Sequence, residues 1–384
     1  WRKHLGGLDM ELTNIRLGDY IERSTINNKE LKYGVDLIVG VNSQGVFAAP
    51  KGNTDGVDLK PYKIVENGAF VYNPTRLELG SIAYRTEGLC IVSHLYMVFY
   101  LTDEGKKIID PMWLYIYFRR SEFCREVKFR NFGSQRPEFN FNDMSDIVIP
   151  LPDIEIQKKY VDIYNAMLEN QKSYEYGLED LKLACDAYIE DLKHGIHCKA
   201  IGPYVERHDV RNRTNEIKNV MGVSTSKEFR EPTSKVNRNE LSNYKIVRPR
   251  QISFVQTTHN EKVFAYAFNN TEDDIVVTSV NEVFSVDEDK LLPEYLCMFF
   301  NRTEFDRYAR FHSWGSARET FTWDDLVKVE IPIADMKTQK SIANIYKAYK
   351  ERKAINDKLK AQIKDICPIL IKGSIEEARK AKEA

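Results

Sequence analysis

The sequence predicts a mixed α+β protein: two similar globular domains separated by a pair of long antiparallel coiled-coil helices, arranged as a pseudo-twofold tandem repeat. Three observations predict this architecture. The second half of the chain repeats the first, each half begins with short strand-like segments, and each half ends in a long stretch with helical periodicity. The 384 residues leave room for two or three domains that each bury a core.

The repeat has a constant offset of 182 residues. In residues 122–164, 16 of 43 positions are identical in the second copy, many more than chance would give. The copies differ most over residues 51–110 and the matching stretch of the second half. Matching pairs include Gly133-Ser134 and Gly315-Ser316, Arg136 and Arg318, Phe139 and Phe321, Asp143 and Asp325, Gln157-Lys158 and Gln339-Lys340, and Tyr62-Lys63 and Tyr244-Lys245.

Each half opens with short apolar segments, residues 37–41, 69–72 and 89–101 in the first copy. Turn residues such as Asn42-Ser43-Gln44-Gly45 and Asn73-Pro74 separate these segments, a pattern that favours strands and loops over long helices. A helix is predicted over residues 111–125, because proline suits a first helical turn and the aromatic residues that follow form a stripe. The second copy predicts the same helix over residues 293–308.

Each half then ends in a predicted long helix, in which apolar residues recur at spacings of three and four. Such a helix of about forty residues spans about 60 Å, so a partner helix must cover its stripe, and the other copy is the expected partner. Asp153 and Asp335 are predicted N-caps, and Arg352 and Asn356 are expected to set the register between the helices. The predicted boundaries are 10–152 for the first domain, 153–195 for the central helix, 196–334 for the second domain and 335–384 for the C-terminal helix.

The net charge of −1 conceals an uneven distribution. Residues 199–250 carry 12 basic and 6 acidic side chains, whereas residues 271–294 carry 8 acidic and 1 basic. Another basic strip lies over residues 119–136. Because backbone phosphates require cations, and because two similar domains on a spacer suit a bipartite duplex target, these strips favour DNA binding.

The strings Gly133-Ser134-Gln135-Arg136, Ile147-Val148-Ile149-Pro150-Leu151-Pro152 and Gln157-Lys158-Lys159, with their second copies, resemble the specificity subunit of Type I restriction-modification enzymes. The resemblance extends from Met10 onward. That family commonly has an acidic residue before the glutamine that heads the helix, where Ile156 and Thr338 stand here, and Pro152 becomes Ala334 in the second copy. These departures bear on the contacts at the helix start.

The resemblance implies two target recognition domains that each read half of a split, asymmetric DNA target, and helices that fix the gap and dock two modification subunits. It implies no catalysis by this chain: the modification subunits bind S-adenosylmethionine and methylate adenine, and a translocating restriction subunit uses ATP and Mg²⁺. The candidate DNA-binding residues are Arg76, Arg130, Ser134, Gln135, Arg136, Lys227, Arg230, Arg310, Ser316 and Arg318. The candidate docking and spacer residues are Gln157, Tyr164, Leu178, Leu181, Gln339, Tyr346, Leu359 and Ile366.

Motifs for other activities are weak. Tyr72-Asn73-Pro74-Thr75 lacks the second proline and the aromatic residue of an adenine methyltransferase motif and is better explained as a turn before Arg76. No Gly-x-Gly turn or phosphate-binding loop occurs. His194, His197 and Cys198 lack further nearby ligands, and the six cysteines form no CxxC pair, so no metal site is expected.

The absence of a long apolar run and of a signal-like start predicts a cytoplasmic protein. Two alternative functions stay open: a scaffold that bridges two proteins without binding DNA, and a specificity subunit of a related methyltransferase system that is not Type I.

Overall fold

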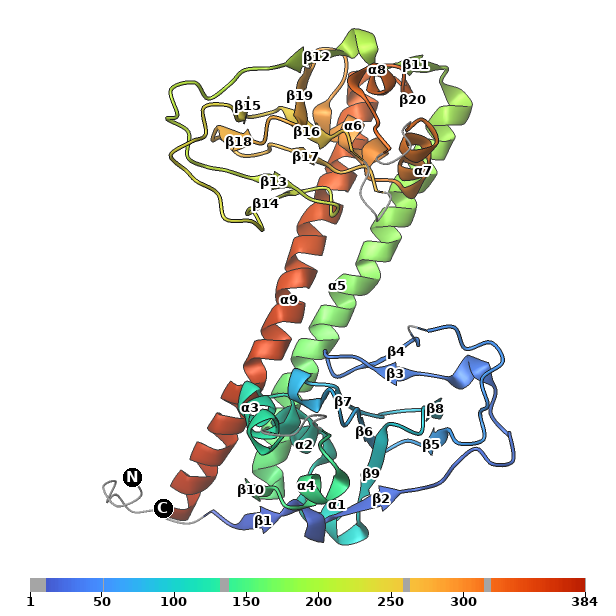
Figure 1. The fold of residues 1–384 in the computed structure, drawn as a ribbon, viewed down its shortest axis with the longest axis vertical. Coiled ribbons are helices and arrows are strands. Elements are labelled where there is room, and N and C mark those ends of the chain that lie inside the picture. Colours follow the sequence, from blue (N-terminus) through green and yellow to red (C-terminus); the bar gives the residue numbers. More distant parts are fainter. Residues whose placement is uncertain (1–11, 51, 132–137, 258–262, 314–318, 384) are drawn as a thin grey trace. The chain divides into compact units, whose positions relative to one another are not determined.

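A computed structural model describes residues 12–50, 52–131, 138–257, 263–313 and 319–383 (Figure 1). The chain divides into two compact units. The first unit contains the chain up to Ser173 and the segment from Asn356 onward, and the second contains Tyr174–Ile355. Each unit therefore holds one globular domain together with part of each long helix.

The first domain is built around a four-stranded antiparallel sheet of order β2-β9-β6-β7, with three further strand pairs, β1-β10, β3-β4 and β5-β8. The strands are β1 (Asn14–Arg16), β2 (Ile21–Ser24), β3 (Gly40–Val41), β4 (Phe47–Ala48), β5 (Lys63–Val65), β6 (Phe70–Tyr72), β7 (Ile82–Tyr84), β8 (Cys90–Val92), β9 (Met97–Leu101) and β10 (Val148–Pro150). The helices are α1 (Asp103–Ile108), α2 (Pro111–Phe118), α3 (Ser121–Arg130) and α4 (Phe141–Ser145).

The second domain repeats this topology strand for strand. Its sheet has the order β12-β19-β16-β17, and its strand pairs are β11-β20, β13-β14 and β15-β18. The strands are β11 (Cys198–Ala200), β12 (Val205–His208), β13 (Gly222–Val223), β14 (Phe229–Arg230), β15 (Lys245–Val247), β16 (Ile252–Val255), β17 (Tyr266–Phe268), β18 (Ile275–Val277), β19 (Asn281–Val286) and β20 (Glu330–Pro332), and the helices are α6 (Pro293–Phe300), α7 (Thr303–Phe311) and α8 (Trp323–Leu326). The predicted mixed architecture and tandem repeat are confirmed.

The helix predicted over residues 111–125 is wrong in one respect, because two helices stand there. α2 ends at Phe118 and α3 begins at Ser121, and the second domain breaks in the same way between α6 and α7. The breaks lie at Arg120 and Arg302, whose extended backbone turns the chain. All six residues from Trp113 to Phe118 are buried, so α2 has no exposed face and its periodicity carries no boundary signal.

Aromatic side chains fill the core of each domain. Phe70, Phe99 and Phe118 pack together beneath the first sheet, with Phe70 stacked on Phe99 at 5.0 Å between ring centroids. In the second domain Phe254 and Phe264 contact each other in a tilted arrangement, at 5.4 Å between ring centroids. Both cores extend onto the long helices, through Tyr164 in the first unit and Tyr346 in the second. Each domain is therefore packed onto helical residues of its own unit.

The two long helices are α5 (Ile154–Gly195, 42 residues) and α9 (Met336–Glu383, 48 residues). In the first unit the start of α5 packs antiparallel against the end of α9, where Lys159 and Tyr160 both contact Glu377. In the second unit Arg352 of α9 lies over the ring of Tyr174 of α5 at 4.9 Å. The predicted antiparallel pairing is thus present within each unit.

The predicted register and cap residues have defined partners. Asn356 is buried and accepts a hydrogen bond from Gln171 at 2.9 Å, a buried polar pair that fits a role in register. The Asp335 carboxylate caps α9, because it accepts hydrogen bonds from the N–H groups of Lys337 and Thr338. At the start of α5 it is the carbonyl of Asp153 that accepts from Ile156 and Gln157.

Capping boxes at equivalent positions begin α4 and α8, with Asn140 and Thr322 as the cap residues. Thr322→Ala should lower the free energy of unfolding of the second domain by about 1 kcal/mol, because the N–H of Asp325 loses its acceptor. Thr322→Ser keeps the hydroxyl and should stay close to wild type. Denaturant unfolding of the three proteins measures the difference, and equal midpoints for the alanine and serine variants would contradict the prediction.

Candidate nucleic-acid interface

The predicted DNA-binding residues fall into three groups. Arg76, Arg130, Arg230 and Arg310 are exposed. Ser134, Gln135, Arg136, Ser316 and Arg318 lie outside the described residues. Lys227 is buried, with 7% of its side chain exposed, and is the one candidate that the structure assigns to another role.

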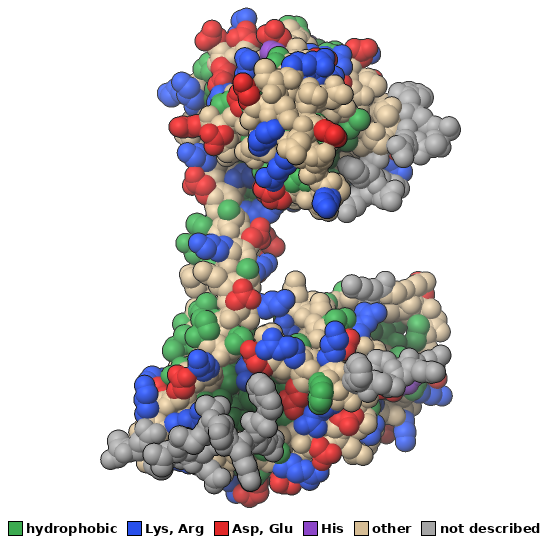
Figure 2. All heavy atoms as spheres, turned by 60° about the vertical axis from the view of Figure 1, so that its left-hand side comes forward, with side chains coloured by type: hydrophobic (Ala, Val, Ile, Leu, Met, Phe, Trp, Pro, Cys, Tyr) green, Lys and Arg blue, Asp and Glu red, His purple; other side chains and the backbone are tan. Residues whose placement is uncertain are grey.

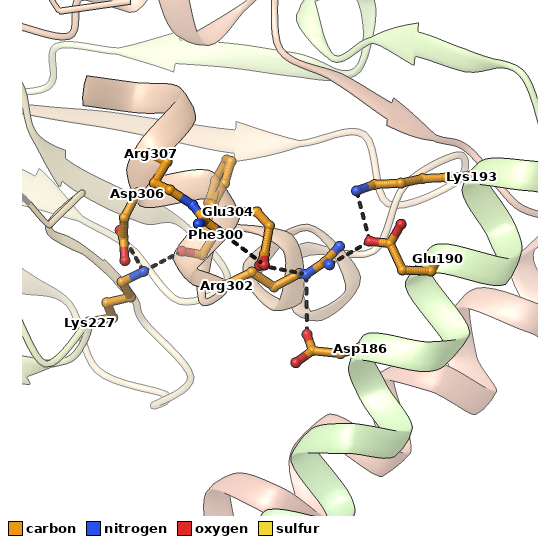
Figure 3. Close-up of polar contacts among 9 residues, drawn as sticks. All are labelled: Asp186, Glu190, Lys193, Lys227, Phe300, Arg302, Glu304, Asp306 and Arg307. Atoms are coloured by element: carbon orange, nitrogen blue, oxygen red, sulfur yellow. Dashed lines mark hydrogen bonds and ion pairs between the residues drawn. The ribbon is translucent and has the colours of Figure 1, made fainter. Parts of the chain in front are cut away.

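Lys227 makes its polar contacts inside the second domain (Figure 3). Its ammonium donates to the carbonyl of Phe300 at 2.7 Å and to the carboxylate of Asp306 at 2.8 Å. Lys227 lies in the β13-β14 turn in a left-handed conformation, with φ of 63°, and its side chain is buried. The prediction that it contacts DNA is therefore wrong, because its ammonium is buried and its charge is paired with Asp306 inside the domain.

In the first domain a cation from a different element supports the equivalent turn. Gly45 occupies the position equivalent to Lys227, also with positive φ, at 77°. The Arg119 guanidinium fills the space beside it and donates to the carbonyl of Gly80 at 2.5 Å. A cation therefore supports this turn in both domains, although it comes from different elements.

Acidic side chains neutralise many of the exposed cations. Figure 2 shows Lys and Arg side chains interspersed with Asp and Glu on the visible face of each unit. Arg130 pairs with Glu126 at 2.8 Å, and Arg250 contacts both Glu288 and Glu294. The basic strips of the sequence are thus only partly available to phosphates. Binding to phosphates depends on the cations that are not paired with an acidic side chain.

A duplicated surface lies on α3 and α7. The sequence predicted Arg310 as a DNA-binding residue and placed residues 119–136 in a basic strip, but it did not single out the two exposed phenylalanines of this surface. Arg125, Lys128 and Phe129 project from one side of α3, and Arg307, Arg310 and Phe311 from the same side of α7, 182 residues later. Phe129 is 82% exposed and Phe311 is 80% exposed, although neither residue packs into a core. Both sets directly precede the Gly-Ser-x-Arg strings. The signal that could have found them is the repeat itself, because phenylalanine stands at the same position of both copies.

The start of each long helix is fixed by a buried glutamine. The Gln157 side chain is fully buried, accepts from the N–H of Asp110 at 2.8 Å and donates to the carbonyls of Ile108 and Pro152. Gln339 makes the equivalent three contacts, with Leu292, Lys290 and Ala334. Every partner of Gln339 lies 182 residues after the matching partner of Gln157. These glutamines, predicted as docking and spacer residues, hold each helix to its own domain, and their docking role stays a prediction.

The other predicted docking and spacer residues are buried or half-buried. Tyr164 and Tyr346 are buried in the two cores, and Leu178, Leu181, Leu359 and Ile366 are half-buried. Tyr188 of α5 is 49% exposed. The apolar side chains that α5 and α9 do present to solvent are Ile163, Tyr176, Leu183, Tyr188, Ile355 and Ile369.

Arg302 anchors α7 to the helix of its own unit. Its guanidinium lies 2.6 Å from Glu190 and 3.2 Å from Asp186, both on α5, and it also contacts Glu304 (Figure 3). The guanidinium holds the pKa of the Glu190 carboxyl below its ordinary value through this hydrogen bond. In the first domain Arg120 instead lies over the Tyr117 ring at 3.7 Å.

No reactive centre emerges from the part of the chain that the structure describes. Its His, Cys, Asp and Glu side chains form no cluster of three that could hold a metal ion. The six cysteines are free thiols, and burial raises the pKa of Cys90, Cys124, Cys185, Cys297 and Cys367. Asn73 forms a turn, since its carbonyl accepts from the N–H of Arg76. Among the described helices, none is long and apolar enough to cross a membrane.

The family model "Type I restriction modification DNA specificity domain" matches the chain twice, over residues 11–175 and 203–365. The chain belongs to this family. Each match covers most of one globular domain and the first part of the helix that follows it, and the second match begins after β11. The two target recognition domains expected from the sequence are therefore present, on a chain whose family supplies DNA target specificity and not catalysis.

Three solved structures resemble the chain over nearly its whole length. A crystal structure of a Type I restriction-modification S subunit from M. genitalium is 11% identical with a TM-score of 0.59, and the similarity covers 94% of this chain and 95% of that one. The HsdS subunit from Thermoanaerobacter tengcongensis is 15% identical, with coverage of 98% and 99% and a TM-score of 0.38. A structure from a study of complex assembly in a type I R-M system is 15% identical, with coverage of 97% and 98% and a TM-score of 0.45. The first of these shows the same fold, and no curated protein matches the chain.

Proposed function

We propose that this chain is the subunit that gives a Type I restriction-modification system its DNA sequence specificity, and that its two domains read the two halves of a bipartite, asymmetric target. The observation that carries the proposal is the duplication. Two domains share one framework of strands and helices, while their sequences differ most between β4 and α2 and between β14 and α6. A constant scaffold with divergent side chains suits two different half-sites.

We assign the long helices to spacing and assembly. α5 and α9 are continuous over 42 and 48 residues, and their exposed apolar side chains offer surface for a protein partner. The partners of this assignment are two modification subunits that methylate adenine and a restriction subunit that translocates and cleaves DNA. S-adenosylmethionine, ATP and Mg²⁺ belong to those partners in this proposal.

Mapping methylated adenines across the genome of cells with and without this chain tests the function directly. A bipartite motif that appears only with the chain supports it. The same motif in cells that do not restrict unmodified DNA would favour a related methyltransferase system. No change in methylation would contradict the proposal.

Replacing both Arg136 and Arg318 with alanine is expected to weaken duplex binding and to flatten its salt dependence, by about 0.9 for each phosphate that the protein no longer neutralises. The control is Lys158→Ala with Lys340→Ala, an exposed pair that is also 182 residues apart, which should leave the slope unchanged. Fluorescence anisotropy of a labelled duplex across a salt series gives both slopes. An unchanged slope in the arginine variant would favour a scaffold that does not bind DNA.

A further inference from the structure

A buried carboxylate lies between two cations in the second domain. Glu282, with 5% of its side chain exposed, accepts hydrogen bonds from Arg207 Nε at 2.8 Å and from Arg207 Nη2 at 2.7 Å. The ammonium of Lys245 lies 3.5 Å from the same carboxylate, and Gln256 also donates to it. The guanidinium and the ammonium together thus form a binding site for an oxyanion with two oxygens.

The register of the sheets identifies the equivalent residues of the first domain. Arg207 lies opposite Phe284 in the β12-β19 pair, as Arg23 lies opposite Phe99 in the β2-β9 pair. Lys63 begins β5 as Lys245 begins β15. Both cations of the second domain are therefore retained in the first.

The acids are not retained. Glu282 lies opposite Phe254 in the β16-β19 pair, and the residue in that register of the first domain is Met97, opposite Tyr72. Asp209, which lies 3.5 Å from Lys245, corresponds to Thr25, because the bridges Arg211–Lys245 and Asn27–Lys63 set the same register. The first domain thus keeps the cations and lacks both carboxylates that neutralise them.

Arg23 and Lys63 have no acidic partner within the described ranges. Lys63 is buried and donates only to the carbonyl of Tyr96, at 2.5 Å, while Arg23 is exposed. Burial lowers the pKa of Lys63, and the charge of Arg23 lowers it further, so the two cations lie within electrostatic range of each other. A pair of like charges with no acid between them is unfavourable unless a ligand supplies the anion.

A buried hydroxyl beside this pair also indicates a site for a ligand. Tyr72 is fully buried, and within the described part of the chain its hydroxyl has no hydrogen-bond partner. Burial raises the pKa of Tyr72, the charge of Asp143 raises it further and that of Arg23 opposes the increase. The Asp143 carboxylate is occupied by the capping box of α4. In the second domain the equivalent residue is Phe254, so the unpaired donor occurs where the acid is missing.

We propose that Arg23 and Lys63 form an oxyanion site in the first domain that takes a backbone phosphate of bound DNA, in the place where the second domain carries its own carboxylate, Glu282. This inference rests on the proposed function. A phosphodiester offers one negative charge and two free oxygens, which match the two cations. The first domain therefore holds its half-site by a phosphate contact that the second domain cannot make.

Installing the acid of the second domain in the first tests the site in the full chain. Met97→Glu places a carboxylate between Arg23 and Lys63, and Met97→Gln is the matched neutral control. Binding to a target duplex across a salt series should give wild type and Met97→Gln the same slope, with Met97→Glu flatter by about 0.9. Arg23→Gln should flatten it equally, and the double variant Arg23→Gln/Met97→Glu should be no flatter than either single variant. Equal slopes for the glutamate and glutamine variants would overturn the proposal.

A second measurement separates this inference from the proposed function. Adding inorganic phosphate at constant ionic strength should raise the melting temperature of the first unit in wild type and in Met97→Gln, and less in Met97→Glu. Equal shifts in all three proteins would show that no oxyanion site exists. A phosphate effect that disappears in Met97→Glu without a change in salt slope would assign the site to a free anion and overturn the DNA contact. A wild-type chain that binds no duplex contradicts the proposed function, whereas the phosphate measurement still decides the site.

Discussion

Replacing Gln157 with alanine should destabilise the first domain by about 3 kcal/mol or more. The substitution removes three hydrogen bonds at once and leaves the N–H of Asp110 and the carbonyls of Ile108 and Pro152 without the amide that satisfies them. Because the glutamine is fully buried, water does not replace these bonds. The junction between the domain and α5 should therefore open first.

Hydrogen exchange measured by peptide locates the effect. Faster exchange is expected in residues 103–118 and at the start of α5 and not in the second unit, and Gln339→Ala should produce the mirror result around residues 287–300 and the start of α9. Lys158→Ala removes an adjacent but exposed side chain and should leave exchange at the junction unchanged. Unchanged exchange in Gln157→Ala would show that the amide does not hold the helix start.

Lys227→Met should destabilise the second domain by about 3 to 5 kcal/mol, because it leaves Asp306 as a largely buried carboxylate without its cation. The N–H of Phe264 still donates to Asp306 at 3.0 Å, so part of the site survives. Denaturant unfolding followed in the second unit measures the destabilisation. A change below about 1 kcal/mol would mean that the lysine is not an essential part of the interior.

The pH dependence of Asp306→Asn provides the complementary result. Burial already lowers the pKa of Lys227 in the folded protein, and the hydrogen bond to Asp306 opposes that shift. Without the carboxylate the pKa should fall further, while the unfolded chain keeps its proton up to about 10.4. Between these two pKa values the unfolded state binds more protons, so stability should rise with pH, more steeply than in wild type. A slope equal to that of wild type would contradict this assignment.

Local patterns in the sequence predicted the elements that depend on residues close to one another along the chain. The heptad spacing identified both long helices, and Asp335 was recognisable as a cap because capping depends on residues within one turn. The helix over residues 111–125 was predicted as one element because its first part is buried on every side, which removes the periodicity that would mark the break at Arg120.

The candidate site was less predictable, because residue type does not reveal what a side chain contacts. Lys227 and Arg230 stand in the same basic strip, yet Lys227 is buried against Asp306 and Arg230 is exposed. Gln157 belongs to a family-like string and was predicted as a docking and spacer residue, and the structure shows that its contacts are with its own domain. Phe129 and Phe311 were visible as a repeated pair, but their exposure was not.

The sequence by itself determined the duplication, the two long helices and the family. A constant offset, a heptad spacing and ordered motifs depend only on the order of residues along the chain. Only the tertiary structure decided which cations are free. Arg207 and Glu282 are 75 residues apart, and Lys227 and Asp306 are 79 apart, so each cation is neutralised by a residue that strand pairing or helix packing brings to it. Arg23 and Lys63 differ from the other cations for the same reason. The sheet position that holds Glu282 in the second domain holds Met97 in the first, so strand pairing supplies these two cations with no acid.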